Sequence, residues 1–270
     1  MTCDGINAES ANRAHWNEIA PVHLKSYGVE GLLAGRSSID EIQKRELYPV
    51  AGKELIHLQC HIGTDTLSLA LDGAKVTGVD FSPESLRIAR DLAARMKIDA
   101  EFIEANVLEL EGRLSRQFDI VYTSQGVLCW IGDIRQWGRT ISSLLKPGGI
   151  FYIFEQHPFL NVFNDTTTGR FELLYPYFGN GEPVHFNDDM PDYADGSYIP
   201  VNKTFEWFWP LSDIIDSLIM SGLEIEFLNE HDVSFHRQLP DMVRGEDGWW
   251  RLPGYENRLP LSFSLRARRK

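Results

Sequence analysis

Gly63 and Asp80 have the residue types and the spacing of a nucleoside site. Gly63 lies in the turn after one apolar run of the sequence, and Asp80 ends the next apolar run. A glycine in such a turn lets the backbone approach a ligand or the following helix closely, and a carboxylate at a strand end can accept hydrogen bonds from both hydroxyls of a ribose. The alternative for Asp80 is a turn residue that precedes Ser82. The pattern favours the ribose-binding carboxylate.

Histidine is the side chain most often used for proton transfer near neutral pH. His157 directly follows a predicted strand, at the end where ligands bind in parallel sheets. We therefore predict that His157 is a base that faces the bound substrate. The alternative is a histidine that orders a loop through hydrogen bonds. His185, His231 and His236 are weaker candidates of the same kind. We find no pair of metal ligands at helical spacing, so we expect no metal.

Aromatic residues crowd one irregular part of the chain. We expect the predicted substrate pocket to use Trp207 and Trp209 from this part, together with Trp16, Tyr27 and Trp130. The other aromatic residues of the segment are Phe159, Phe163, Phe171, Tyr175, Tyr177, Phe178, Phe186, Tyr193, Tyr198, Phe205 and Phe208. Such residues can line an apolar pocket, form a small satellite core or build a subunit interface. The chain is expected to be a monomer or a homodimer.

The elements that must position these residues follow a regular alternation. Short apolar runs alternate with helical patterns, which is typical of a parallel sheet with crossover helices. Strands are predicted at residues 55–60, 75–80, 100–104, 118–124 and 150–155, and helices at residues 64–72, from Pro83 and from Ile134. The alternation lapses after residue 155 for a stretch of the length that usually forms a lid or binding loop.

Regular structure returns towards the C-terminus. A helix is predicted at residues 211–221 and strands at 223–228 and 261–267, which could form a hairpin at one sheet edge. The segment 10–27 is expected to be a helix laid over the domain. The fold class is therefore α/β, with a mostly parallel sheet, an antiparallel C-terminal edge hairpin and helices on both faces.

Composition limits the possible partners. The chain has 26 Lys and Arg against 39 Asp and Glu, a net charge of −13 that would repel nucleic acid. The three cysteines, Cys3, Cys60 and Cys129, are odd in number and form no CxxC motif, so no disulfide framework or zinc site is expected. No apolar run approaches the ~20 residues that span a bilayer, and the N-terminus lacks the features of a signal peptide. We expect a cytoplasmic protein without membrane contact.

Five segments, in order, resemble the motifs of class I S-adenosylmethionine-dependent methyltransferases. They are residues 55–70, 76–82 (VTGVDFS), 105–107 (ANV), 118–124 (FDIVYTS) and 144–149 (LLKPGG). The resemblance implies a Rossmann-like, doubly wound, seven-stranded sheet and S-adenosylmethionine as cofactor. It also implies that the cofactor contacts Gln59, His61, Gly63, Thr64, Asp80, Phe81, Asn106, Val107, Ser124 and Gln125.

The first motif departs from the family. Glycines are usual at Gln59 and His61, and an acidic residue at His57. Either the two side chains line the site and bind the carboxylate or ammonium group of the ligand, or the turn runs wider and His61 is a surface or supporting residue. Asn106 stands where the family has an aspartate, and its amide oxygen can still accept from an exocyclic amine.

These observations favour one domain over residues 1–270. It comprises an N-terminal helical cover (1–50), a cofactor-binding core (51–155), an aromatic-rich substrate insertion (156–210) and a C-terminal helix with edge strands (211–270). The predicted function is methyl transfer to oxygen or nitrogen of a small molecule. The alternatives are a non-catalytic cofactor- or nucleoside-binding subunit and a nicotinamide-dependent oxidoreductase, although the GxGxxG motif of the latter is absent.

Overall fold

A seven-stranded sheet organises the chain. The computed structural model describes residues 7–187 and 189–270; Cys3 lies outside this range. The strand order is β3-β2-β1-β4-β5-β11-β8. The strands are β1 (Glu54–Leu58), β2 (Lys75–Asp80), β3 (Glu101–Glu104), β4 (Phe118–Ser124), β5 (Leu145–Gln156), β8 (Leu223–His231) and β11 (Ser262–Arg269). β1 to β5 are parallel, and β11 runs antiparallel to both of its neighbours.

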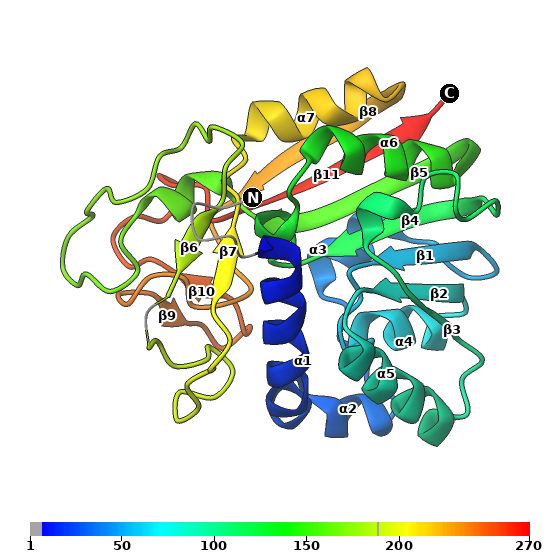
Figure 1. Cartoon of the computed structure of the whole chain (residues 1–270), viewed down its shortest axis with the longest axis horizontal. Coiled ribbons are helices and arrows are strands. Elements are labelled where there is room, and N and C mark those ends of the chain that lie inside the picture. Colours follow the sequence, from blue (N-terminus) through cyan, green and yellow to red (C-terminus); the bar gives the residue numbers. More distant parts are fainter. Residues whose placement is uncertain (1–6, 188) are drawn as a thin grey trace.

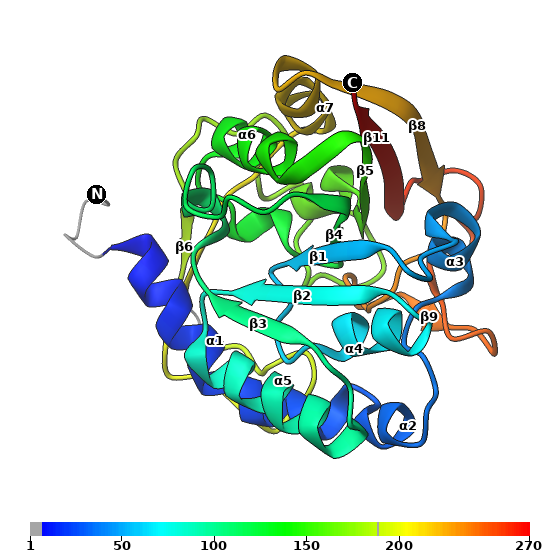
Figure 2. The ribbon, with the colours of Figure 1, turned by 90° about the vertical axis from the view of Figure 1, so that its right-hand side faces the viewer.

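Helices cover both faces of the sheet, as Figure 2 shows. They are α1 (Ala8–Ser26), α2 (Val29–Leu33), α3 (Glu41–Leu47), α4 (Thr64–Leu71), α5 (Pro83–Met96), α6 (Ile134–Leu144) and α7 (Leu211–Met220). On one face, Trp137 of α6 and Leu218 of α7 pack against Val121 and Phe151. On the other face, Leu69 of α4 and Leu47 of α3 belong to a second apolar cluster. This burial of alternate strand residues on both faces explains the near-continuous apolar runs in the sequence.

Local signals set the helix starts. Ser82 accepts from the backbone N–H of Ser85 at 3.1 Å, and Pro83 occupies the first position of α5, where no N–H is needed. Asp133 caps α6 in the same way through the N–H of Gln136 at 2.8 Å. The predicted helices and strands of the core are therefore confirmed, with ends that differ by a few residues.

The carboxyl ends of the parallel strands point towards α1 and the segment after β5 (Figure 1). That segment contains a two-stranded hairpin of β6 (Val184–Phe186) and β7 (Thr204–Glu206), and the loop between β8 and β11 contains β9 (Val243–Arg244) and β10 (Trp250–Arg251). Short 3-10 turns lie at η1 (Val107–Glu109), η2 (Leu128–Trp130) and η3 (Pro158–Val162). The order of strands reverses between β1 and β4, and ligands bind outside such a switch point.

The C-terminal pair of strands confirms the predicted antiparallel hairpin at one sheet edge. β8 and β11 are antiparallel neighbours at the end of the sheet. Within this pair β11 lies between β5 and β8, so β8 is the outermost strand. Within the described residues, no helix is long and apolar enough to cross a membrane.

Gly138 permits the closest approach of α6 and α7. A Cβ at this position would overlap the carbonyl oxygen of Ser217 and lie 2.9 Å from Oγ of Ser221. We predict that Gly138→Ala lowers the free energy of unfolding by about 1 to 3 kcal/mol, because overpacking outweighs the better helix propensity of alanine. Urea denaturation measures this change.

Gly31→Ala is the matched control, because a Cβ there meets only the side chain of Arg36, at 3.3 Å. This variant should be neutral or slightly more stable. Equal effects of the two substitutions would contradict the close-packing argument.

Candidate functional site

A cavity of about 740 Å³ opens at the carboxyl ends of the parallel strands. Its wall combines residues of α1, the turns after β1, β2 and β4, the segment after β5 and the loop before β11. Nine of the ten expected cofactor residues line it: Gln59, His61, Thr64, Asp80, Phe81, Asn106, Val107, Ser124 and Gln125. This volume lies within the range of small-molecule sites, ~300 to 1,000 Å³.

Gly63, the tenth, lies behind the wall. Its φ of +78° is in the left-handed region, and a Cβ would meet Cβ of Ala89 at 3.0 Å and the ring of Phe102 at 3.2 Å. Glycine is therefore required here for the turn and for close helix packing rather than for direct contact with a ligand.

Asp80 ties the turns after β1 and β2 together. Its Oδ2 accepts from the backbone N–H of His61 at 2.8 Å, and its Oδ1 accepts from the N–H of Ser82 at 2.9 Å. Burial raises the pKa of Asp80 to about 6, although these backbone hydrogen bonds oppose the shift. Each carboxylate oxygen keeps one lone pair, so Asp80 can still accept two further hydrogen bonds.

Gln59 and His61 adopt the backbone conformation of the glycines that they replace. Their φ angles are +57° and +49°. A side chain in this region costs on the order of 1 kcal/mol relative to glycine, and such strain concentrates at functional sites. The turn is therefore not widened. Gln59 donates through Nε2 to the carbonyl of Val127 at 3.1 Å, whereas its buried Oε1 has no protein partner in the described chain.

Asn106 and Ser124 are partly engaged by the protein. Oδ1 of Asn106 accepts from the N–H of Leu108 at 3.0 Å, which leaves one lone pair on that oxygen. Ser124 donates to Oδ2 of Asp65 at 2.9 Å. Gln125, at a φ of +28°, lies 3.3 Å from Oδ2 of Asp40 through its Nε2. These contacts fix the edges of the cavity next to the β3 and β4 ends.

Glu155 holds the loop after β4. Its carboxylate accepts from the backbone N–H groups of Gly126 at 2.6 Å and Val127 at 2.8 Å. Burial raises its pKa, while these bonds lower it. Because backbone donors already occupy the carboxylate, Glu155 has a structural task.

The geometry does not support His157 as the base. It is not among the residues that line the cavity. Its Nδ1 accepts from the N–H of Phe159 at 3.1 Å, and its Nε2 lies 3.0 Å from Oε1 of Glu230. Burial lowers its pKa, partly offset by Glu230. His157 thus orders the loop after β5, which was the alternative that the sequence left open.

The other histidines are divided. His185 stacks on Phe205 at 4.3 Å between ring centres, and His231 lies 3.1 Å from Oγ of Ser264; neither lines the cavity. His236 does line it, with Nε2 2.8 Å from Oε1 of Gln238. All five residues expected in the substrate pocket line the cavity as well: Trp16, Tyr27, Trp130, Trp207 and Trp209.

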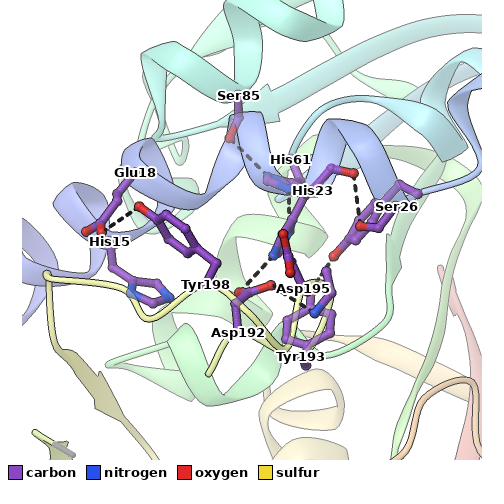
Figure 3. A network of polar contacts seen from close by, with 12 residues as sticks. His15, Glu18, His23, Ser26, His61, Ser85, Asp192, Tyr193, Asp195 and Tyr198 are labelled. Atoms are coloured by element: carbon purple, nitrogen blue, oxygen red, sulfur yellow. Dashed lines mark hydrogen bonds and ion pairs between the residues drawn. The ribbon is translucent and has the colours of Figure 1, made fainter. Parts of the chain in front are cut away.

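A chain of polar contacts joins the turn after β1 to α1 and the segment after β5 (Figure 3). Nδ1 of His61 lies 3.0 Å from Oγ of Ser85, and its Nε2 lies 3.0 Å from Nδ1 of His23. Nε2 of His23 lies 3.1 Å from Oδ2 of Asp192. A carboxylate only accepts, so Nε2 of His23 is the donor to Asp192.

Glu18 of α1 provides a second anchor for the same segment. It accepts from the backbone N–H groups of Val201 at 2.7 Å and Asn202 at 2.8 Å, and from the hydroxyl of Tyr198 at 2.9 Å. α1 and the segment after β5 therefore form one continuous side of the cavity.

The sequence did not single out several lining residues. They are Asp65, His15, Asp192 and Glu206; His23, buried behind the wall, was missed as well. Asp65 had a usable signal, since it follows the first-motif turn directly in the first turn of α4. Asp192 and Glu206 lie in an irregular segment, where no periodicity assigns a direction to a side chain.

No group of three or more histidine, cysteine or acidic side chains within 7–187 and 189–270 has the arrangement of a metal site. Cys60 and Cys129 are both free. Burial raises the pKa of the Cys60 thiol and also that of the Cys129 thiol, so neither is an activated nucleophile.

Comparison with known proteins places this arrangement in a family. Residues 56–151 match the family model of the methyltransferase domain. The core of the chain is therefore similar to a methyltransferase domain. A ubiquinone biosynthesis O-methyltransferase of Erwinia tasmaniensis is 33% identical over 98 residues, which are 36% of this chain and 40% of that protein. The match therefore spans well under two thirds of the relative's length.

Solved structures share the fold of the methyltransferase domain and its surroundings. An S-adenosylmethionine-dependent methyltransferase from Mesorhizobium loti is 21% identical with a TM-score of 0.58, covering 83% of this chain and 95% of its own. One from Clostridium acetobutylicum is 14% identical with a TM-score of 0.57, covering 92% and 99%. These likenesses confirm the predicted fold class.

Asp192→Asn should loosen the segment after β5. Asp192 uses both oxygens, Oδ2 for His23 and Oδ1 for the N–H of Ala194 at 2.8 Å, and asparagine offers only one acceptor. One buried donor would then lose its acceptor, which should lower the free energy of unfolding by about 1 to 3 kcal/mol. The lost contact should also accelerate amide exchange across residues 184–206. Urea denaturation and hydrogen–deuterium exchange measure the two effects.

Asp189→Asn provides the comparison, because Asp189 is exposed and pairs only with Lys203 among the contacts described, at 2.8 Å. Its loss should cost less than about 0.5 kcal/mol. Unchanged exchange in Asp192→Asn would refute the anchoring role of Asp192.

Proposed function

We propose that this protein transfers a methyl group from S-adenosylmethionine to a small molecule. The observation that carries the proposal is that two acceptors lie on one cavity wall: Asp80 at the end of β2, and Oε1 of Gln59 after β1, which has no partner among the described residues. The hydroxyls of a ribose need an acceptor such as the Asp80 carboxylate, and an ammonium group needs an acceptor such as Oε1 of Gln59. The methyltransferase domain supports the same cofactor.

The residues present fit that cofactor. Asp80 would hold the ribose hydroxyls with its two remaining lone pairs, and Phe81, Asn106 and Val107 would enclose the adenine. Oε1 of Gln59 would accept from the amino group of the methionine part. When bound, S-adenosylmethionine supplies a methyl group activated on a sulfonium sulfur.

The task of the protein is then to orient the acceptor and to exclude water. α1 and the segment after β5 enclose the cavity from the side opposite the sheet, fixed by the contacts of His23, Asp192 and Glu18. Such a covered site strips the acceptor of water and holds it in line with the methyl group. A base is needed only when the acceptor must lose a proton.

The acceptor is proposed to be a small molecule that is methylated on oxygen or nitrogen. The similar protein of Erwinia tasmaniensis is a ubiquinone biosynthesis O-methyltransferase, which supports a small acceptor. The aromatic wall of Trp16, Trp130 and Trp207 supports one with an apolar or aromatic body. The family match covers residues 56–151 and therefore includes neither α1 nor the segment after β5, which form two parts of this wall. For that reason the match does not decide whether oxygen or nitrogen is methylated.

S-adenosylhomocysteine should raise the melting temperature of the protein, and NADH should not, because a ligand that binds only the folded state stabilises it. Asp80→Asn should remove most of that increase by weakening the ribose contact, with a loss of affinity of about tenfold or more. Differential scanning fluorimetry provides the measurement.

The matched control is Asp91→Asn, which alters an exposed acid of α5 near Arg95. It should leave the temperature shift unchanged. A full shift in Asp80→Asn would exclude the ribose contact, and a shift with NADH alone would exclude the methyltransferase reaction.

The affinity for S-adenosylhomocysteine should fall in mild acid. Burial raises the pKa of Asp80 to about 6, so the carboxylate dominates above that pH and the neutral acid below it. If only the carboxylate holds the ribose, the dissociation constant at pH 5 should be about tenfold that at pH 7.5. Calorimetric titration at both values tests this expectation. The dissociation constant of Asp80→Asn should change far less, and an equal change would assign the effect to another group.

A further inference from the structure

Glu206 is an acidic side chain in the cavity wall that has no cationic partner among the residues the structure describes. It ends β7 and lines the cavity. The hydroxyl of Thr204, at 3.3 Å from Oε1, is the one donor to its carboxylate within the described part of the chain, and no ion pair there includes it. Burial raises the pKa of Glu206 to about 7, opposed by Thr204 and reinforced by the charge of Asp165.

The backbone on both sides of Glu206 is fixed. Asn12 of α1 donates to the carbonyl of Phe205 at 2.7 Å and accepts from its N–H at 2.8 Å. The N–H of Trp207 donates to the carbonyl of Cys129 at 2.8 Å. Two neighbouring residues are thus anchored to α1 and to η2, so Glu206 is held at its place in the wall and does not belong to a free loop.

Aromatic rings line the same cavity as Glu206. Trp16 and Trp130 lie edge to face at 5.3 Å between ring centres, His15 stacks on Trp130 at 6.3 Å, and Trp207 lines the same cavity. The faces of such rings attract cations. The basic residues of the wall are Lys203, which pairs with Asp189 at 2.8 Å, and Arg237, whose guanidinium donates to the carbonyl of Pro240.

We propose that the methyl acceptor is an amine with an apolar or aromatic body, and that Glu206 binds its nitrogen. This inference rests on the proposed methyltransferase function and names its substrate class. A half-buried carboxylate that has no counter-charge among the described residues costs free energy that a bound ammonium group would recover. A neutral alcohol would leave that cost in place, and a carboxylic acid would increase it.

The same contact prepares the nitrogen for reaction. The bound ammonium gives one proton to the Glu206 carboxylate, and the nitrogen lone pair then forms the new N–C bond. The C–S bond breaks with its electron pair on sulfur, which becomes a neutral thioether, and the product leaves as the methylated ammonium. Burial lowers the pKa of an amine while it raises that of Glu206, which makes this proton transfer less unfavourable.

Matched probes test the substrate class. 2-Phenylethylamine, 2-phenylethanol and 3-phenylpropionate share a similar body and differ in charge. Calorimetric titration of the full chain, with and without saturating S-adenosylhomocysteine, should give at least tenfold tighter binding of the amine than of the alcohol, and no binding of the acid. Glu206→Gln should reduce amine affinity at least tenfold and leave alcohol affinity within twofold.

Two further variants separate the contact from general charge. Glu9→Gln removes the same charge from an exposed residue of the same cavity wall and should keep the preference for the amine. Glu206→Asp keeps the charge and should keep the preference at reduced affinity; it also serves if Glu206→Gln does not fold. Equal binding of amine and alcohol, no amine binding at 10 mM, or an unchanged preference in Glu206→Gln would each overturn the proposal.

The two hypotheses fail in different ways. Absence of S-adenosylhomocysteine binding would end the proposed methyl transfer, whereas the amine preference of the protein without that ligand would still test Glu206. Binding of S-adenosylhomocysteine together with preference for the alcohol would retain methyl transfer and reject the amine acceptor.

Discussion

The carboxylate of Asp80 is the contact on which the rest of the site depends. By accepting the N–H of His61 and the N–H of Ser82, it joins the turn after β1 to the turn after β2. These turns lead into α4 and α5, so one buried side chain sets the relative position of two helices and two strands. The conformation of His61 at a positive φ is tolerated because this hydrogen bond and the contacts of its ring stabilise it.

From that turn the constraint extends to distant parts of the chain. The ring of His61 contacts His23 of α1, and His23 contacts Asp192 in the segment after β5. A histidine at a position where the family has glycine therefore does more than occupy space: it gives the cofactor turn a direct connection to the cover of the cavity. This connection provides a physical reason for the departure from the usual glycine pattern.

The two halves of the cavity use their acidic groups differently. Near the sheet, Asp80, Glu155 and Asp65 accept from backbone N–H groups or hydroxyls, which compensates their burial. On the opposite side, Glu206 has only the hydroxyl of Thr204 in the described chain. This difference motivates the proposal that the acceptor itself provides the missing positive charge.

The sequence by itself determined the order of core strands and helices, the place of the turn before Gly63 and the role of Asp80 as a strand-end acid. These features depend on local signals: the spacing of apolar residues along the sequence, the helix cap at Ser82 and Pro83, and the glycine turn. Only the tertiary structure decided that β11 lies inside the sheet, that His157 orders a loop, and that His23, Asp192 and Glu206 gather around one cavity. Those outcomes depend on contacts between residues far apart in the chain, and a segment without periodicity carries no signal of which way its side chains point.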